Sequence, residues 1–401
     1  MVLDTAELNK LKDRVCAEID TLREEAEFIA TDMHQHPEVG WDTPRSAGLL
    51  TDYMERHGMK VEKGLAGLAC SFRGSIRGRE DQRPGISLLA EYDALPGLGH
   101  ACSHNLIGTA AATAGIALSR VLSEHPAVPG NVYVMGTPFE EGGGGKIIML
   151  EHGVFDVADA SIMFHGSNRI QVGSPNIAAV SMTYTFHGRS AHSGASPHEG
   201  INAADAAMIT FTAVNALRQH LTSDVRVHGI INEAGVAANI VPERAVVTMM
   251  ARARTKSVLE EVVEKVNNCA RAGALATGCQ LEIEQGPVFA ERVVVPSYRP
   301  VALENMRRLK LDPPTDDPQT FASADSGNVS YAMPHLTFTL PLDDRGSVPH
   351  TPEFAEACNS RQGREAMLTA AKIMAMTALD LMTDPELLQT IKAEHRQLVG
   401  R

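Results

Sequence analysis

The feature that most constrains the fold is a series of short apolar runs that each end in a polar or glycine-rich segment. Four such runs are "GISLLAEYDALPG" (85–97), "NVYVMGTPFEEGGGG" (131–145), "ASIMFHGSN" (160–168) and "LTFTLPL" (336–342). Runs of this length, bounded by Gly, Pro and polar residues, are typical of buried strands. A helical stretch such as "NLIGTAAATAGIALSRVLSEH" (105–125) lies between two of them. The alternation predicts an α/β domain with an open, mostly parallel sheet flanked by helices.

The stretch from about residue 178 to 290 has a different order of elements. A strand-like segment is followed by a helix, two further strands, a second helix and a last strand, "CQLEIEQG". This β-α-β-β-α-β order is the ferredoxin-like plan. We therefore predict a discontinuous catalytic domain, residues 1–177 and 291–401, with an α+β lid or dimerisation domain inserted over residues 178–290.

Charge and composition exclude some classes of function. The formal net charge of −13 predicts a surface that repels phosphate backbones, so we expect no nucleic-acid partner. No uninterrupted apolar run reaches the roughly 18 residues that a membrane span needs, so we expect no membrane partner. The charged N-terminal segment has apolar residues at helical spacing, which indicates an amphipathic helix rather than a signal peptide and favours the cytoplasm.

Side chains of the kinds that bind divalent metals lie beyond the ends of the predicted strands. They are Cys102, His104, Glu140, Glu141, His165 and His350. Chemistry in open α/β sheets lies at the carboxyl ends of the strands, so we expect these side chains to converge. Thiolate, imidazole and carboxylate are ligands for Zn²⁺ and related ions. A nucleophilic Cys102 with His104 as its base is a rival interpretation, but it leaves the other four residues without a function.

Several motifs together resemble the di-metal aminoacylase, hippuricase and carboxypeptidase G family of metallopeptidases. They are "HQHPEVG", "EYDALPGLGHACSHN", "TPFEEGGGG", "MFHG", "GRSAHSGASPHEGINAADA", "NIVPERA" and "HTPEF", and the resemblance runs from about residue 30 to about residue 375. Within the family the chain is most similar to the amidohydrolases with a cysteine metal ligand. That branch includes hippurate hydrolase, auxin-conjugate hydrolases, p-aminobenzoyl-glutamate hydrolase and β-alanyl-lysine dipeptidase-like proteins.

The resemblance implies a dinuclear metal site. Glu140 would be the general base, taking a proton from the attacking water and passing it to the leaving nitrogen. Asp93 would orient one of the metal ligands by contacting that ligand, without binding an ion itself. The ions would be two Zn²⁺ or Mn²⁺, with Co²⁺ or Ni²⁺ as alternatives. Their ligands would be Cys102, His104, Glu141, His165 and His350.

The resemblance also implies roles for the inserted domain. His192, in "GRSAH", would hydrogen-bond the developing oxyanion, and a homodimer would form through this domain. Asn239 and Arg252 would bind a carboxylate of the substrate. The implied activity is that of a metal-dependent amidohydrolase acting on an N-acyl amino acid or a dipeptide-like amide with a free carboxylate.

Two departures from the family pattern leave questions open. The usual "CGHD" loop reads Cys102-Ser103-His104-Asn105 here, and Asn105 also occurs in the dipeptidase-like branch. Asp325, in "SADSGNVSYAMP", receives no role. A non-catalytic binding or scaffold homologue is a further alternative, but every expected ligand and the expected base are present.

Overall fold

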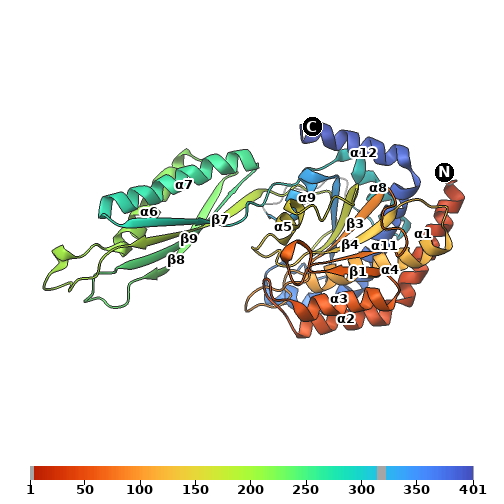
Figure 1. Ribbon diagram of the computed structural model, residues 1–401, viewed down its shortest axis with the longest axis horizontal. Coiled ribbons are helices and arrows are strands. Elements are labelled where there is room, and N and C mark those ends of the chain that lie inside the picture. Colours follow the sequence, from red (N-terminus) through yellow and green to blue (C-terminus); the bar gives the residue numbers. More distant parts are fainter. Residues whose placement is uncertain (1–3, 314–321, 401) are drawn as a thin grey trace. The chain divides into compact units, whose positions relative to one another are not determined.

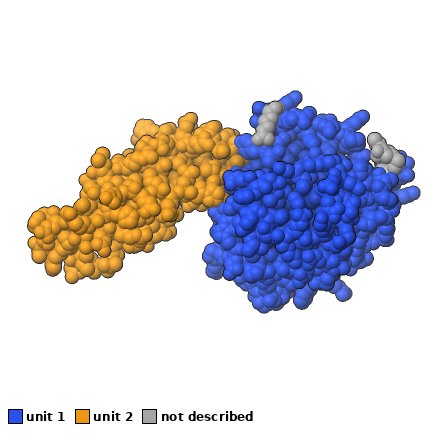
Figure 2. Space-filling view, viewed as in Figure 1, with its two compact units in different colours: residues 1–175, 292–320, 325–401 blue, residues 176–291, 321–324 orange. Residues whose placement is uncertain are grey.

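The computed structural model describes residues 4–313 and 322–400, which fall into two units (Figures 1 and 2). Of the described residues, unit 1 contains 4–175, 292–313 and 325–400. Unit 2 contains residues 176–291 together with residues 322–324. The chain therefore re-enters unit 1 twice, first at Arg292 and again at Asp325.

A seven-stranded sheet runs through unit 1 in the order β1-β2-β4-β3-β5-β11-β6. Strand β3 pairs in parallel with β4 and β5, and β5 pairs in parallel with β11, whereas β1, β2 and β6 add antiparallel pairs. Every residue of β3 and β4 is buried, as expected for parallel strands covered on both faces. The strands are β1 Lys60–Lys63, β2 Phe72–Ser75, β3 Gly85–Ala90, β4 Asn131–Gly136, β5 Ala160–Ser167, β6 Gln171–Val172 and β11 His335–Pro341.

Helices flank this sheet (Figure 1). Helices α4 and α11 are long and apolar enough to cross a membrane, but 89% and 83% of their most apolar windows are buried inside the unit. They pack against each other and against the sheet, so they supply much of its core. The helices are α1 Thr5–Thr21, α2 Arg23–Gln35, α3 Pro44–Arg56, α4 His104–Glu124, α5 Gly145–Glu151, α8 Arg299–Arg308, α9 Ser326–Ala332, α10 Pro352–Cys358, α11 Arg361–Thr383 and α12 Pro385–Leu398.

Unit 2 is a four-stranded antiparallel sheet, in the order β10-β7-β9-β8, with two helices packed against it. Side chains along β7 alternate between buried and half-buried, so Met182, Tyr184 and Phe186 enter the core under the helices. The β-α-β-β-α-β order confirms the predicted ferredoxin-like plan, and unit 1 confirms the mostly parallel sheet. The elements are β7 Ala178–His187, α6 Ala203–Leu217, β8 Arg226–Ala234, β9 Arg244–Ala253, α7 Lys256–Thr277 and β10 Gln280–Gln285.

Candidate active site

The metal-binding side chains predicted from the sequence converge at one edge of the unit 1 sheet. The segments that carry them follow the carboxyl ends of β3, β4 and β11, and His165 lies near the end of β5 itself. Parallel strands end at a common edge, so segments far apart in the sequence meet there. The sequence placed His104 in a loop before a helix starting at residue 105, whereas His104 is the first residue of α4.

Cys102 and Glu141 each approach a histidine from another segment. The Sγ atom of Cys102 lies 3.5 Å from Nε2 of His165. The Oε1 atom of Glu141 lies 3.7 Å from Nε2 of His350. Ligand atoms of Cys102, Glu141 and His350 all lie within 4.8 Å of one another, and so do those of Cys102, His104 and His165. Cys102 is common to both groups.

His104 faces both glutamates of the "EEGGGG" segment. Its Nε2 atom lies 3.9 Å from a carboxylate oxygen of Glu140 and 3.9 Å from one of Glu141. All three residues again have ligand atoms within 4.8 Å of one another. The six side chains therefore form one continuous cluster of sulfur, nitrogen and oxygen atoms that can bind a metal.

Two atoms of this cluster indicate whether the site suits a cation. His104 Nε2 and Glu141 Oε1 are buried and have no hydrogen-bond partner among the described residues. Leaving such atoms without a hydrogen bond costs about 1–3 kcal/mol each, and bound cations would satisfy them. Burial lowers the pKa of His165 to about 4, so its imidazole is neutral. Burial also lowers the pKa of His104, but the charges of Cys102 and Asp93 outweigh it and raise this pKa well above its ordinary value, so a cation bound there would replace a proton. The residues present therefore fit divalent ions.

Asp93 holds His104 and the glutamate loop together. The Nδ1 atom of His104 lies 2.8 Å from the backbone carbonyl of Asp93 and 3.3 Å from its Oδ1. With Nδ1–H donating to these oxygens, Nε2 keeps its lone pair for a metal. The carboxylate of Asp93 also accepts the backbone N–H groups of Glu140 and Glu141, each at 3.1 Å.

The backbone is strained at the site. Five described residues other than glycine have a positive φ, and three of them are here: Ser103 at 65°, Phe139 at 52° and His350 at 68°. Non-glycine residues in this region cost of order 1–3 kcal/mol, and such strain concentrates at functional sites. Glycine is the residue that takes this conformation freely, so the serine in place of the family's glycine needs a compensating contact.

That contact joins the Cys102 loop to the end of β5. The hydroxyl of Ser103 donates to the carbonyl of Cys102 at 2.5 Å and accepts the N–H of Gly166 at 3.0 Å. A Cβ atom at Gly166 would lie 2.5 Å from this hydroxyl, so the glycine makes room for the serine. Ser103 thus holds the segments of Cys102 and His165 together.

Glu140 is buried beside other carboxylates. Burial raises its pKa well above the ordinary value, and the charges of Glu91, Asp325 and Glu141 raise it further. A buried carboxyl group with a raised pKa, beside other ligand-type residues, is suited to proton transfer.

A buried ion cluster that was not predicted from the sequence lies next to Glu140. The Nζ atom of Lys146 lies 2.6 Å from Oε1 of Glu91 and 2.6 Å from Oδ1 of Asp325. Burial lowers the pKa of Lys146, but the two carboxylates outweigh burial and raise it, so the lysine stays charged. Glu91 could have been found, because it lies two residues before Asp93. Nothing in the sequence marks Lys146, since lysines are rarely buried.

Three predicted site residues belong to unit 2. The exposed His192 pairs across an isolated bridge with Ile240, and the carbonyl of Asn239 accepts the N–H of Ser193 at 3.0 Å. His192 and Asn239 therefore lie on adjoining segments. Arg252 is half-buried on β9, and its Nη1 donates to the hydroxyl of Ser323 at 3.1 Å.

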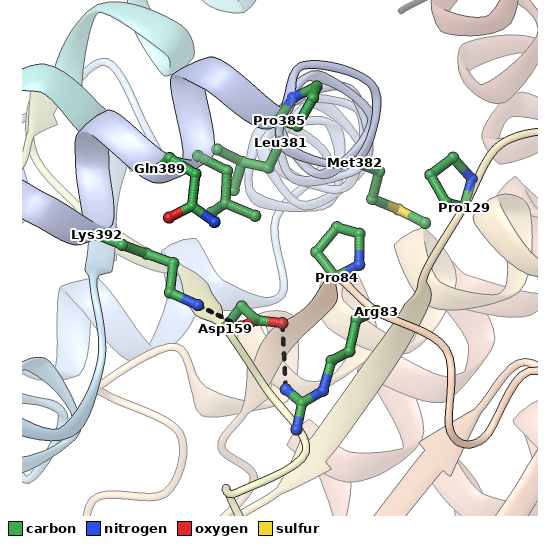
Figure 3. A pocket seen from close by; sticks show the side chains of 10 residues that line it. Arg83, Pro84, Pro129, Asp159, Leu381, Met382, Pro385, Gln389 and Lys392 are labelled. Atoms are coloured by element: carbon green, nitrogen blue, oxygen red, sulfur yellow. Dashed lines mark hydrogen bonds and ion pairs between the residues drawn. The ribbon is translucent and has the colours of Figure 1, made fainter. Parts of the chain in front are cut away.

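A cavity of about 350 Å³ lies at the other edge of the unit 1 sheet (Figure 3). Its lining residues Pro84, Pro129 and Asp159 precede β3, β4 and β5, so they mark the amino ends of these strands. Asp159 is paired there with Arg83 and Lys392. This cavity is separate from the cluster at the carboxyl ends.

The chain is similar to known peptidases and amidohydrolases. Residues 173–277 match the peptidase dimerisation domain family. A Xaa-Arg dipeptidase of Mus musculus is 34% identical, over 98% of this chain and 93% of the relative. A p-aminobenzoyl-glutamate hydrolase chain of Escherichia coli is 27% identical, over 95% of this chain and 94% of the relative.

A solved structure shows the same fold. The YXEP protein of Bacillus subtilis, described as a dinuclear metal binding peptidase from the M20 family, matches with a TM-score of 0.66 at 19% identity. The match covers 90% of this chain and 99% of that protein. Because the identity to the mouse dipeptidase extends along almost the whole chain, the protein belongs to the M20 peptidase family, as its motifs predicted.

Proposed function

We propose that this protein is a metal-dependent amidohydrolase that cleaves an N-acyl amino acid or a dipeptide-like amide with a free carboxylate. The observation that carries the proposal is the convergence of six donor side chains, two of whose buried atoms, His104 Nε2 and Glu141 Oε1, have no hydrogen-bond partner among the described residues. The similarity to an Xaa-Arg dipeptidase makes dipeptides with a C-terminal arginine the first substrates to test, and p-aminobenzoyl-glutamate the second.

The proposed ligands of two divalent ions are one thiolate, three imidazoles and one carboxylate. Bound ions would lower the pKa of water and polarise the scissile carbonyl. Mixed S, N and O donors suit Zn²⁺ or Mn²⁺, and Co²⁺ or Ni²⁺ are alternatives. Asp93 fixes His104 in the tautomer that leaves Nε2 free. The ligands are Cys102, His104, Glu141, His165 and His350.

Glu140 is the proposed general base. Its carboxylate would accept a proton from the attacking water and return it to the leaving nitrogen. Burial raises the pKa of Glu140, which strengthens this carboxylate as a base. The contact between its backbone N–H and Asp93 holds the loop in place during these steps.

His192 is the proposed oxyanion donor. Its Nδ1 accepts the N–H groups of Gly194 and Ala195, both at 3.1 Å, so a neutral ring carries its proton on Nε2. An Nε2–H in an exposed position can donate to a developing oxyanion. Asn239 and Arg252 are the proposed partners of the substrate carboxylate.

The domain assignment and the assembly are part of the proposal. Residues 1–177 and 291–401 would act as the catalytic domain, and residues 178–290 as a lid through which a homodimer forms. The match to a peptidase dimerisation domain supports the dimer. The six cysteines are free thiols, which suits a cytoplasmic enzyme.

The test combines metal analysis with a base variant. We expect about two divalent ions per chain and loss of hydrolysis on chelation. Glu140→Gln should lower kcat by about 10²- to 10⁴-fold with the metal content kept. The exposed Glu151→Gln is the matched control and should retain activity.

Two results would contradict the proposal. Activity that survives chelation but is lost on thiol alkylation would make Cys102 a nucleophile. A metal-free protein that hydrolyses no substrate of the panel would favour the scaffold interpretation. The panel comprises Xaa-Arg dipeptides, β-alanyl-lysine, p-aminobenzoyl-glutamate, hippurate, N-acetyl amino acids and indole-acetyl amino acids.

A further inference from the structure

A buried lysine binds two carboxylates behind the candidate base. The side chains of Lys146, Glu91 and Asp325 are at most 1% exposed, and the ammonium group lies 2.6 Å from each carboxylate. Asp325 also accepts the backbone N–H of Lys146 through Oδ2 at 3.0 Å. Asp325 therefore contacts both the backbone and the side chain of the same residue.

The three residues come from three segments of unit 1. Glu91 follows β3 and lies two residues before Asp93. Lys146 is the second residue of α5, five positions after Glu141. Asp325 directly precedes α9. The ion cluster therefore connects the loop that carries the candidate base to the end of β3 and to α9.

The same cluster adjoins the points where the chain enters unit 1. Asp325 is the first residue after the second excursion into unit 2, and Arg292 is the first after the earlier one. Arg292 donates to the carbonyl of Ser174 at 2.8 Å and to the hydroxyl of Ser326 at 3.2 Å. Ser326 follows Asp325 directly, so the chain entries and the base loop share one polar network.

Charge explains why a lysine is needed at this position. Carboxylate oxygens of Glu91, Glu140 and Asp325 lie within 4.8 Å of one another. The Lys146 ammonium already binds two of the three, so it supplies the cation that such a group requires. Without it, the three carboxylates would repel one another, and the loop of Glu140 would move away from β3.

We propose that Lys146 is a positioning residue for the hydrolysis, holding the loop of Glu140 and Glu141 in place through Glu91 and Asp325. This inference rests on the proposed function, because it assumes that Glu140 and Glu141 serve one metal site. It assigns a role to Asp325 as well, as the carboxylate that binds both the backbone N–H and the ammonium group of Lys146.

The test compares two buried lysines. Lys146→Met removes the charge at nearly constant volume, and Lys146→Arg keeps the charge. Lys12→Met is the matched control, because Lys12 is 7% exposed and lies 2.6 Å from Asp380, between α1 and α11. For each protein we would measure kcat, KM, the melting temperature and the affinity for Zn²⁺ against a competing chelator.

We expect Lys146→Met to lower kcat by about 10²-fold with KM nearly unchanged, and to weaken Zn²⁺ binding by about tenfold or more. Lys146→Arg should recover part of both losses. Lys12→Met should lower only the melting temperature. Asp325→Asn tests the same contact if Lys146→Met does not fold, and it should show the same two losses.

Wild-type kcat and Zn²⁺ affinity in Lys146→Met, with a fall in melting temperature like that of Lys12→Met, would overturn the inference. The same result in Asp325→Asn, where that variant must be used, would overturn it too. Failure of the proposed function is distinguishable, because then the wild-type protein itself would bind no metal and hydrolyse no substrate.

Discussion

Ser103 illustrates how one residue can replace a glycine in a strained loop. Its φ of 65° is unfavourable for a side chain, yet its hydroxyl contacts both the carbonyl of Cys102 and the N–H of Gly166. The gain of a buried hydrogen bond offsets the backbone strain. The residue that seemed a departure from the family pattern is therefore accommodated by local contacts.

Ser103→Ala should lower the free energy of unfolding of the metal-free protein by about 1–3 kcal/mol, because the N–H of Gly166 loses its partner. Ser103→Gly should be less destabilising, since glycine relieves the positive φ. Urea denaturation of the three proteins measures both differences. Equal stability of the wild type and Ser103→Ala would show that the serine hydroxyl is not needed.

The central strands combine apolar burial with a few paired polar groups. His335 begins β11 opposite Ser161 of β5, and its ring nitrogens contact the hydroxyls of Ser161 and Thr337 at 2.8 and 2.7 Å. Burial lowers the pKa of His335 well below its ordinary value, and the charges of Arg292 and Lys146 lower it further. Strand β11 therefore begins with a neutral histidine.

This depressed pKa predicts a pH dependence of stability. Below the ordinary His pKa of about 6.5, the unfolded chain gains a proton at residue 335 and the folded chain does not, so stability falls as pH falls. The contribution approaches about 1.4 kcal/mol per pH unit. His335→Gln should show a shallower decline between pH 6.5 and 5 in denaturant titrations; an unchanged slope would contradict this account.

At the scale of the whole molecule, β8 is an edge strand that exposes large apolar side chains. It ends the unit 2 sheet, and Ile230 and Ile231 are 62% and 43% exposed. An exposed apolar edge favours pairing with another chain. The proposed homodimer would cover this edge.

Ile231→Lys should therefore convert the dimer to a monomer, because it places a charge on the edge. Light scattering after gel filtration gives the mass of each species. Phe28→Lys, at a 63% exposed position on α2, is the control and should remain a dimer. A wild-type monomer, or an Ile231→Lys dimer, would contradict this assembly.

The sequence by itself determined the central strands of the α/β unit, the element order of the inserted unit, the edge of the sheet where the candidate ligands gather, and the family. Apolar periodicity and glycine-bounded runs depend on local chemistry, so they were sufficient to predict the α/β unit and the ferredoxin-like unit. They were also sufficient to predict that residues such as Cys102 and His165 converge. Only the tertiary structure revealed the cluster of Lys146, Glu91 and Asp325. A buried charge is stable only beside partners that the fold brings from distant segments, and no local pattern encodes that pairing.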